Sequence, residues 1–210
     1  MDNFDAADTA DTAEIGKTAL GAVTARRPTL AFAPELLLRA QPIRLAFFDV
    51  DGVLTDGGLI YGAEGEALKR FNVMDGFGIK LLRASGIEPV IITGLAGAPL
   101  RRRAAVLGVT RAYYACRNKL AAAEATLTDL GLAWSQAGVI GDDWPDLALV
   151  ARAAFVAAPA NAHAEIKALA HYVTERSGGQ GAVREWCDLL LCANGHYARA
   201  FEQALQGSVP

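Results

Sequence analysis

The chain has 210 residues, 52% hydrophobic and 20% charged, which is enough to bury the core of about one domain. Its formal net charge of −3 gives no electrostatic footprint for DNA or RNA, and the one short basic run lies in a predicted helix. Because it lacks a long apolar stretch, a signal-peptide pattern and cysteines at zinc or disulfide spacing, we expect a cytoplasmic protein that binds neither nucleic acid nor membrane.

The beginning of the chain differs from the rest in composition. Asp, Ala and Thr dominate up to residue 18, prolines interrupt the segment, and residues 33–41 alone fit a short helix. We therefore predict a mobile N-terminal extension over residues 1–41, one folded domain over 42–195 and a C-terminal tail over 196–210.

From residue 44 onward, short apolar runs alternate with longer segments of helical periodicity. The strand-sized runs cover residues 45–50, 88–93, 111–115, 137–141, 153–158 and 171–174. The helical segments cover residues 76–84, 100–107, 119–130, 146–151 and 183–193. This alternation predicts an α/β fold, a doubly wound parallel sheet of the Rossmann-like kind that binds ligands at the carboxyl ends of its strands.

Residues 57–71 break this alternation. Their sequence, GGLIYGAEGEALKRF, places turn glycines around short apolar runs, which predicts a β-hairpin that projects from the sheet. The segment is too short for a large cap domain.

Two carboxylates follow the first predicted strand. Asp49 and Asp51 are two residues apart, so an extended chain sends both side chains to the same side, and Gly52 lets the chain turn. A carboxylate at such a position can attack phosphorus, bind a divalent cation or do both, while its neighbour holds the proton that a leaving oxygen needs. An isolated pair is more often a simple turn, but the motif DVDGVLTDG is longer and more specific.

A second acidic cluster follows the predicted strand at 137–141. Asp142, Asp143 and Asp146 offer oxygen ligands with no histidine or cysteine nearby, which favours Mg²⁺. Asp143 or Asp146 also fits the role of an N-cap for a helix that begins at Pro145, but this alternative does not account for all three residues.

Thr93, Gly94 and Lys119 add weaker signals. A hydroxyl in a glycine turn can bind a phosphoryl oxygen, and an ammonium at the start of a helix can steady a phosphate. Taken alone, they fit an ordinary turn and a solvated lysine. Because each lies at a strand end or a helix start, in the order acid pair, hydroxyl, lysine and acid cluster, we expect one phosphate-binding and metal-binding site.

These motifs resemble those of the haloacid dehalogenase superfamily of phosphatases. More narrowly, residues 44–193, including FNVMDGFGIKLL and HYVTERSGGQGAVREWCDLLL, resemble the 3-deoxy-D-manno-octulosonate 8-phosphate phosphatases. The resemblance implies hydrolysis of that ester through an aspartyl-phosphate. It makes Asp49 the nucleophile and Asp51 the general acid and base, with Thr93 and Lys119 holding the phosphate.

The resemblance also implies how a cofactor is bound. Asp142 would join Asp49 and the backbone carbonyl of Asp51 around Mg²⁺, while Asp143 and Asp146 would orient these ligands.

Asp75 and Arg184 are candidate substrate contacts. From residue type alone, Arg184 fits equally an anion-binding turn or an ordinary amphipathic helix. The family lacks a large cap domain and is tetrameric, so the resemblance implies a homotetramer in which the hairpin packs toward a neighbour's site.

The sequence lacks two arginines and one glycine of the family pattern. Leu95 and Met74 stand where family members usually carry arginine, and Ala115 and Cys116 stand where a glycine is common. The missing positive charges leave open a phosphatase for another sugar-acid phosphate, such as a nonulosonate 9-phosphate. Two alternatives from other classes are a receiver-like signalling domain, in which Asp51 would be unusual, and a non-catalytic binding or assembly protein on the same fold.

Overall fold

A parallel sheet forms the centre of the molecule. The computed structural model describes residues 27–208 and 210, and its main sheet has the strand order β5-β4-β1-β6-β7-β8, with every neighbouring pair parallel. The strands are β1 (Leu45–Phe48), β4 (Glu88–Ile92), β5 (Arg111–Tyr113), β6 (Ala137–Ile140), β7 (Phe155–Ala158) and β8 (Tyr172–Val173). Each lies within a run that the sequence predicts as a strand, so the predicted fold class is confirmed.

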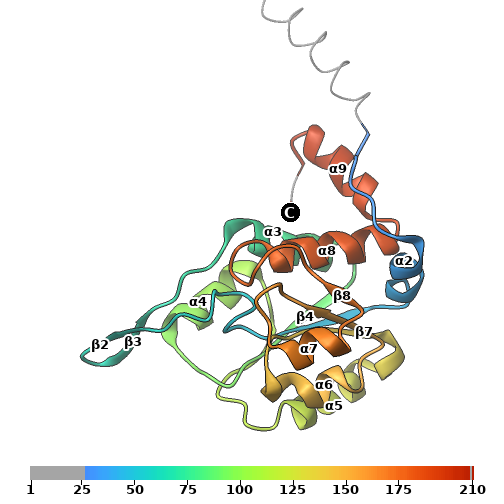
Figure 1. Cartoon of the computed structure of the whole chain (residues 1–210). Helices are drawn as coiled ribbons and strands as arrows, with labels where there is room; N and C mark the ends of the chain where they lie inside the picture. Colours follow the sequence, from blue (N-terminus) through green and yellow to red (C-terminus); the bar gives the residue numbers. More distant parts are fainter. Residues whose placement is uncertain (1–26, 209) are drawn as a thin grey trace, which may run out of the picture.

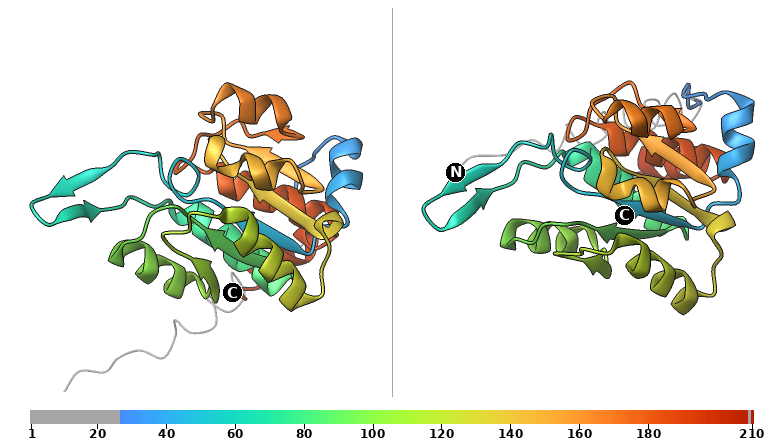
Figure 2. Two further views of the ribbon diagram at one scale, coloured as in Figure 1. Left: turned by 90° about the horizontal axis from the view of Figure 1, so that it is seen from below. Right: turned by 60° about the horizontal axis from the view of Figure 1, so that its bottom comes forward.

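Helices cover both faces of this sheet (Figures 1 and 2). One layer contains α2 (Pro34–Ala40), α3 (Val73–Ala84), α4 (Ala98–Leu107) and α8 (Ala182–Ala193). The other contains α5 (Lys119–Leu130), α6 (Leu147–Val150) and α7 (Ala164–Leu169). Strand side chains alternate between the two layers, since Phe48 packs in the first cluster and Phe47 in the second.

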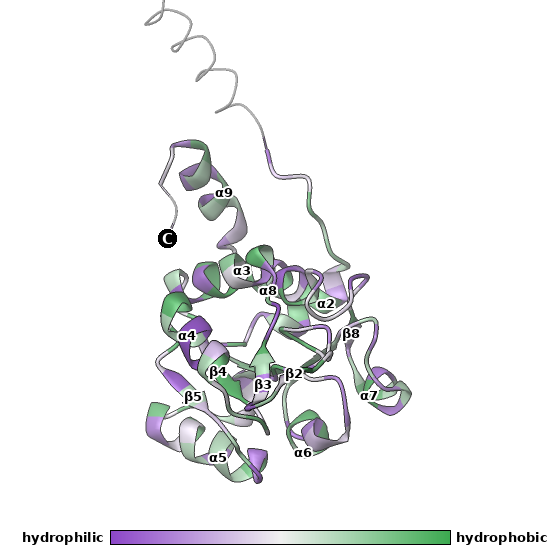
Figure 3. Cartoon of the chain, turned by 90° about the vertical axis from the view of Figure 1, so that its left-hand side faces the viewer, coloured by the Kyte–Doolittle hydropathy of each residue, from purple (hydrophilic) through white to green (hydrophobic). Residues whose placement is uncertain are grey.

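Most of these helices have one buried and one solvent-facing side. Figure 3 shows hydrophilic and hydrophobic residues mixed along the helices that surround the sheet. In α8 the fully buried Trp186 packs edge to face against Phe48 of β1, with ring centroids 5.1 Å apart. This contact fixes α8 on the sheet beside the strand that leads to Asp49.

The chain winds outward from β1 in two directions. It passes through α3 and α4 to β4 and β5 on one side, and through α6 and α7 from β6 to β7 and β8 on the other. β1 and β6 therefore lie side by side at the point where the winding changes direction. In open α/β sheets, ligands bind at the carboxyl ends of the strands at this position.

The predicted hairpin is present and projects from the body of the molecule (Figures 1 and 2). It consists of β2 (Ile60–Gly62) and β3 (Gly65–Leu68), which pair antiparallel with an irregular register between Ile60 and Tyr61. Most of its side chains are exposed, and it is far smaller than a cap domain.

Both ends of the described chain carry a helix. The helix α2, in the predicted extension, packs against α8 and buries Ala40, while residues 1–26 lie outside the described residues. The helix α9 (Tyr197–Leu205) occupies the predicted C-terminal tail, and Tyr197 packs partly against the core. Within residues 27–208 and 210, no helix is long and apolar enough to cross a membrane.

Candidate active site

The ends of several sheet elements converge on one cavity of about 360 Å³. Asp49 follows β1, Thr93 follows β4, Asp142 follows β6, and Lys119 is the first residue of α5. The predicted site residues that line this cavity are Asp49, Asp51, Thr93, Gly94, Lys119, Asp142 and Asp143. The doubly wound topology accounts for the convergence, because parallel strands present their carboxyl ends at one edge.

Lys119 links two of the carboxylates. Asn118 caps α5 by accepting a hydrogen bond from the Ala121 backbone N–H, which starts the helix at Lys119. The Lys119 side chain is 6% exposed, and its Nζ lies 2.8 Å from Asp49 Oδ1 and 2.7 Å from Asp146 Oδ1. Burial alone would lower the pKa of Lys119, but the negative charges of Asp49 and Asp146 outweigh it and raise that pKa.

Both side-chain oxygens of Asp146 are bonded to neighbouring residues of the site. Its Oδ1 is paired with Lys119, and its Oδ2 accepts a hydrogen bond of 3.2 Å from the Asp142 backbone N–H. Asp146 itself is buried, at 2% exposure. With both oxygens engaged, Asp146 orients its neighbours, and the side chains of Asp49 and Asp142 remain available for a ligand.

The three carboxylates fit a hard divalent cation. One oxygen from each of Asp49, Asp142 and Asp146 lies within 4.8 Å of the others. Burial, then the charge of Asp146, raises the pKa of Asp49 to about 6. Burial, then the charge of Asp49, raises the pKa of Asp142 to about 7. A cation between these groups would favour their ionised forms and so lower the pKa of both carboxyls. The donor atoms are all oxygens, which suits Mg²⁺.

Gly52 allows this close approach. Its φ is +86°, and a Cβ added there would lie 2.0 Å from Asp142 Oδ2. Any side chain at position 52 would therefore displace Asp142, in addition to straining the backbone.

Asp51 has a partner that the sequence analysis missed. Lys69 Nζ donates to Asp51 Oδ1 over 2.5 Å and lies 2.7 Å from Glu66 Oε1. The Thr55 hydroxyl also donates to Asp51 Oδ1, over 3.4 Å. Burial alone would lower the pKa of Lys69, but its contacts with the carboxylates of Asp51 and Glu66 outweigh burial and raise that pKa. No sequence signal marks Lys69, which lies just beyond an exposed hairpin strand.

Thr93 and its loop form another wall of the cavity. The Leu95 backbone N–H donates to Thr93 Oγ1 over 3.3 Å, and Thr93 O accepts from the Cys116 N–H over 2.9 Å. Ala115 has a φ of 50°, in the left-handed region that glycine favours. Ala115 and Cys116 occupy the place where a glycine is common in the family.

Comparisons with known proteins agree with this geometry. No family model matches the chain. The 3-deoxy-D-manno-octulosonate 8-phosphate phosphatase KdsC of Salmonella typhimurium is 42% identical over 173 residues, which cover 82% of this chain and 92% of the relative. The chain belongs to the 3-deoxy-D-manno-octulosonate 8-phosphate phosphatase family.

Solved structures support the same assignment. The phosphatase of this family from Yersinia pestis matches with a TM-score of 0.77 and 43% identity over 79% of this chain and 90% of that chain. The one from Moraxella catarrhalis, solved with a magnesium ion, a phosphate ion and KDO, matches with a TM-score of 0.76 and 40% identity over 79% of this chain and 95% of that chain. The resemblance to the phosphatase family is thus confirmed.

The glycine-rich segment before α8, at residues 178–181, packs against the loop that follows β1. A Cβ added to Gly178 would lie 1.8 Å from Gly52 O, so the two backbones are in direct contact. The Gly179 N–H donates to Val53 O over 2.9 Å. Asn161 bridges the two loops, since it donates to Gly52 O and accepts from the Gly178 N–H. The loop before α8 therefore holds the loop that carries Asp49 and Asp51.

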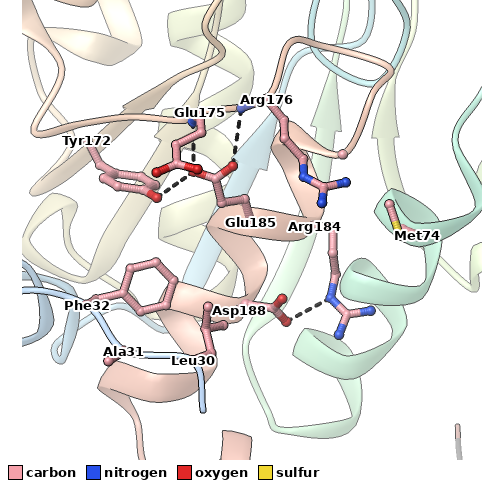
Figure 4. A pocket seen from close by; sticks show the side chains of 11 residues that line it. Leu30, Ala31, Phe32, Met74, Tyr172, Glu175, Arg176, Arg184, Glu185 and Asp188 are labelled. Atoms are coloured by element: carbon pink, nitrogen blue, oxygen red, sulfur yellow. Dashed lines mark hydrogen bonds and ion pairs between the residues drawn. The ribbon is translucent and has the colours of Figure 1, made fainter. Parts of the chain in front are cut away.

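Asp75 and Arg184 do not line the cavity that contains Asp49, Asp51 and Lys119, which is the candidate catalytic cavity. Asp75 is buried, and its Oδ1 accepts a 2.8 Å hydrogen bond from the Arg184 backbone N–H in the first turn of α8. The Arg184 side chain pairs with Asp188 over 2.8 Å and lines a second cavity of about 450 Å³ together with Met74 (Figure 4). Their role in substrate binding stays a prediction.

Of the two positions at which arginine is usual in the family, one lines the cavity that contains Asp49 and Lys119. Leu95 lines the catalytic cavity, whereas Met74 lines the second one. The two departures from the family pattern therefore affect different parts of the molecule.

Proposed function

We propose that the chain is a Mg²⁺-dependent phosphomonoesterase that hydrolyses 3-deoxy-D-manno-octulosonate 8-phosphate to the free sugar acid and phosphate. The observation that carries this proposal is the contact of Lys119 with both Asp49 and Asp146, beside Asp142, in a cavity that Asp51 also lines. The activity named for the relatives supports the choice of substrate.

We assign the reaction to two steps. Asp49 attacks phosphorus in line while the ester P–O bond breaks, and the leaving oxygen takes a proton from Asp51. Water then gives a proton to Asp51 and attacks the aspartyl-phosphate, which releases phosphate and restores the carboxylate of Asp49. Thr93, Gly94 and Lys119 hold the phosphoryl oxygens throughout.

The cation would be held at the same cavity. The carboxylates of Asp49 and Asp142 and the backbone carbonyl of Asp51 are its proposed ligands, oriented by Asp143 and Asp146. When bound, Mg²⁺ neutralises negative charge that would otherwise keep a carboxylate nucleophile and a phosphate apart.

Leu95 gives a reason to consider a second substrate. This side chain is 42% exposed and lines the catalytic cavity at a position where arginine is usual in the family. An apolar group there removes a positive charge that is usual beside the substrate in the family, so the alternative is a phosphatase for another sugar-acid phosphate, such as a nonulosonate 9-phosphate.

Phosphate release from a substrate panel tests the proposal. The panel contains the octulosonate 8-phosphate, a nonulosonate 9-phosphate and simple hexose phosphates, each assayed with Mg²⁺ and with EDTA. We expect Mg²⁺-dependent release with the octulosonate ester preferred. Preference for the nonulosonate ester would assign the alternative, and no release from any ester would indicate a non-catalytic protein.

We further propose that the protein is a cytoplasmic homotetramer. The hairpin exposes Leu59, Ile60, Tyr61 and Leu68 at 47% to 67%, a concentration of apolar surface that fits packing against a neighbouring subunit. Light scattering should give about four times the 22.1 kDa of one chain, and the double substitution Ile60→Glu, Leu68→Glu should lower that mass. A monomeric wild type would overturn the assembly, and cell fractionation tests the location.

A further inference from the structure

The hairpin reaches the active site through one side chain. Lys69 follows β3 at the base of the hairpin, and its side chain is 1% exposed although most hairpin residues face solvent. Its Nζ contacts Asp51 Oδ1 at 2.5 Å and Glu66 Oε1 at 2.7 Å. A buried ammonium is therefore placed between the catalytic acid and a carboxylate of the hairpin.

Arg70, the next residue, also forms an ion pair at the base of the hairpin. Arg70 pairs with Asp56 in the open, with side chains 65% and 39% exposed. Such an exposed pair can hold the base of the hairpin while both charges stay in water. Burying an ammonium removes its charge from water, and this removal is costly. The burial of Lys69 on Asp51 thus exceeds what anchoring requires.

The contact with Lys69 engages one carboxylate oxygen of Asp51 and leaves the other without a partner among the described residues. Lys69 and Thr55 both donate to Oδ1. Oδ2 is buried and has no hydrogen-bond partner within the described residues, while Asp51 lines the catalytic cavity. One oxygen is held by protein, and the other is available to exchange a proton with a bound ester.

We propose that Lys69 is a positioning residue for the reaction, which fixes Asp51 through Oδ1 so that Oδ2 delivers the proton to the leaving oxygen. The inference rests on the proposed phosphatase function. As Asp49 bonds to phosphorus and the ester P–O bond breaks, the proton moves from Asp51 Oδ2 to the departing alkoxide. The Asp51 carboxylate that remains faces the ammonium of Lys69, and Glu66 keeps that ammonium in place.

The test compares two leaving groups. The sugar alkoxide needs a proton to depart, whereas the nitrophenolate of p-nitrophenyl phosphate departs without one. We measure kcat/KM, which covers the steps up to formation of the aspartyl-phosphate. Lys69→Met should lower kcat/KM for the sugar phosphate about 100-fold, as expected for lost general-acid catalysis, but for p-nitrophenyl phosphate less than about fivefold.

Three variants sharpen this test. Arg70→Met, one residue away, should leave both values within about twofold of wild type, since its ion pair is exposed. Lys69→Arg should recover part of the loss for the sugar phosphate. Adding Lys69→Met to Asp51→Asn should cause no further loss, because residues that act through one another are not additive. Glu66→Gln gives a milder reduction of the same kind and replaces Lys69→Met if the latter does not fold.

The outcomes separate this inference from the proposed function. Wild-type turnover with equal losses for both esters in Lys69→Met would show that Lys69 is a structural anchor and overturn the inference alone. Additive losses in the double variant would do the same. A wild type that hydrolyses neither ester overturns the proposed function and, with it, the inference.

Discussion

The catalytic cavity and the second cavity at the start of α8 use charged side chains in opposite ways. In the second cavity, Glu185 accepts hydrogen bonds from the Tyr172 hydroxyl and from two backbone N–H groups (Figure 4). Arg184 is paired with Asp188 one helical turn away. These charges hold the loop and the first turns of α8 in place.

In the catalytic cavity the carboxylates face one another. Asp49 and Asp142 approach within 4.8 Å, and burial together with neighbouring negative charge raises the pKa of both. Such an arrangement is costly unless a ligand completes it. Lys119 is shared between Asp49 and Asp146, so negative charge exceeds positive charge in this cluster. In the second cavity, by contrast, Arg184 has Asp188 as its own partner. Similar residue types therefore mark a reactive site where one charge is in excess, and a structural one where the charges are paired.

The largest expected effect is at Asp49, the proposed nucleophile. Asp49→Asn keeps the side-chain shape but cannot form the aspartyl-phosphate, so turnover should fall by about 10⁴-fold or more. The control is Asp129→Asn, the same change at an exposed ion pair with Arg111. Steady-state phosphate release and thermal unfolding are measured on both. Turnover by Asp49→Asn near the wild-type rate would remove the basis for treating this cavity as reactive.

Gly178 connects the two regions, and a side chain there should disturb the catalytic loop. The added Cβ of Gly178→Ala would meet Gly52 O at 1.8 Å, so backbone must move, and we expect a loss of roughly 3 kcal/mol in the free energy of unfolding. Gly62→Ala, whose Cβ would have its nearest neighbour at 3.4 Å, is the control. Denaturant titration of both variants measures the difference, and equal stabilities would contradict the described contact.

The affinity for Mg²⁺ should increase with pH. Without the cation, a pKa of about 6 for Asp49 and about 7 for Asp142 means that protons compete with the metal at pH 6 and much less at pH 8. We expect about tenfold weaker binding per pH unit for each proton displaced. Isothermal titration with MgCl₂ at pH 6, 7 and 8 measures this.

The same pKa values fix the sign of a stability effect. The metal-free folded state holds these protons more tightly than the unfolded chain, where the ordinary value is 3.8. This contribution to stability is therefore full below about pH 4, falls as pH rises, and is lost above about pH 6 for Asp49 and about pH 7 for Asp142, where added MgCl₂ should restore it. Thermal unfolding that is independent of pH with and without Mg²⁺ would show that the carboxylates are not coupled as described.

The smallest expected effect is in the second cavity. Arg184→Met removes the pair with Asp188, and we expect a loss of about 1 kcal/mol in stability. The same variant tests the predicted substrate contact, because the side chain lines the second cavity. A roughly tenfold rise in KM would support that contact and show that both cavities serve the reaction, and a KM within about twofold of wild type would contradict it.

Much of the fold was predictable because buried strands leave a strong pattern. Each strand of the main sheet is a short apolar run between polar turns, and the longer helices have clear periodicity. The helices α7 and α9 were missed. α7 has six residues and buries Ile166 alone, so it leaves little apolar periodicity. α9 does carry apolar residues at helical spacing, at positions 197, 200, 201, 204 and 205, so its pattern was present in the sequence and was overlooked.

The site was predictable where it depends on topology and was missed where it depends on distant contacts. Asp49, Thr93 and Asp142 follow parallel strands, and such ends must converge. Lys69 gave no signal, because a lysine three residues after a glutamate in an exposed hairpin looks like a solvated pair. The contact of Gly178 with the catalytic loop was equally hidden, since nothing local specifies which segments meet.

That glycine contact has a consequence for biosynthesis. A ribosome delivers the loop at residues 49–56 well before its support at Gly178 and Gly179. A nascent chain that stops before β8 carries the complete nucleophile motif but lacks the backbone that braces it. The loop that carries Asp49 and Asp51 is therefore braced only after the segment at residues 178–179 has been made and has docked.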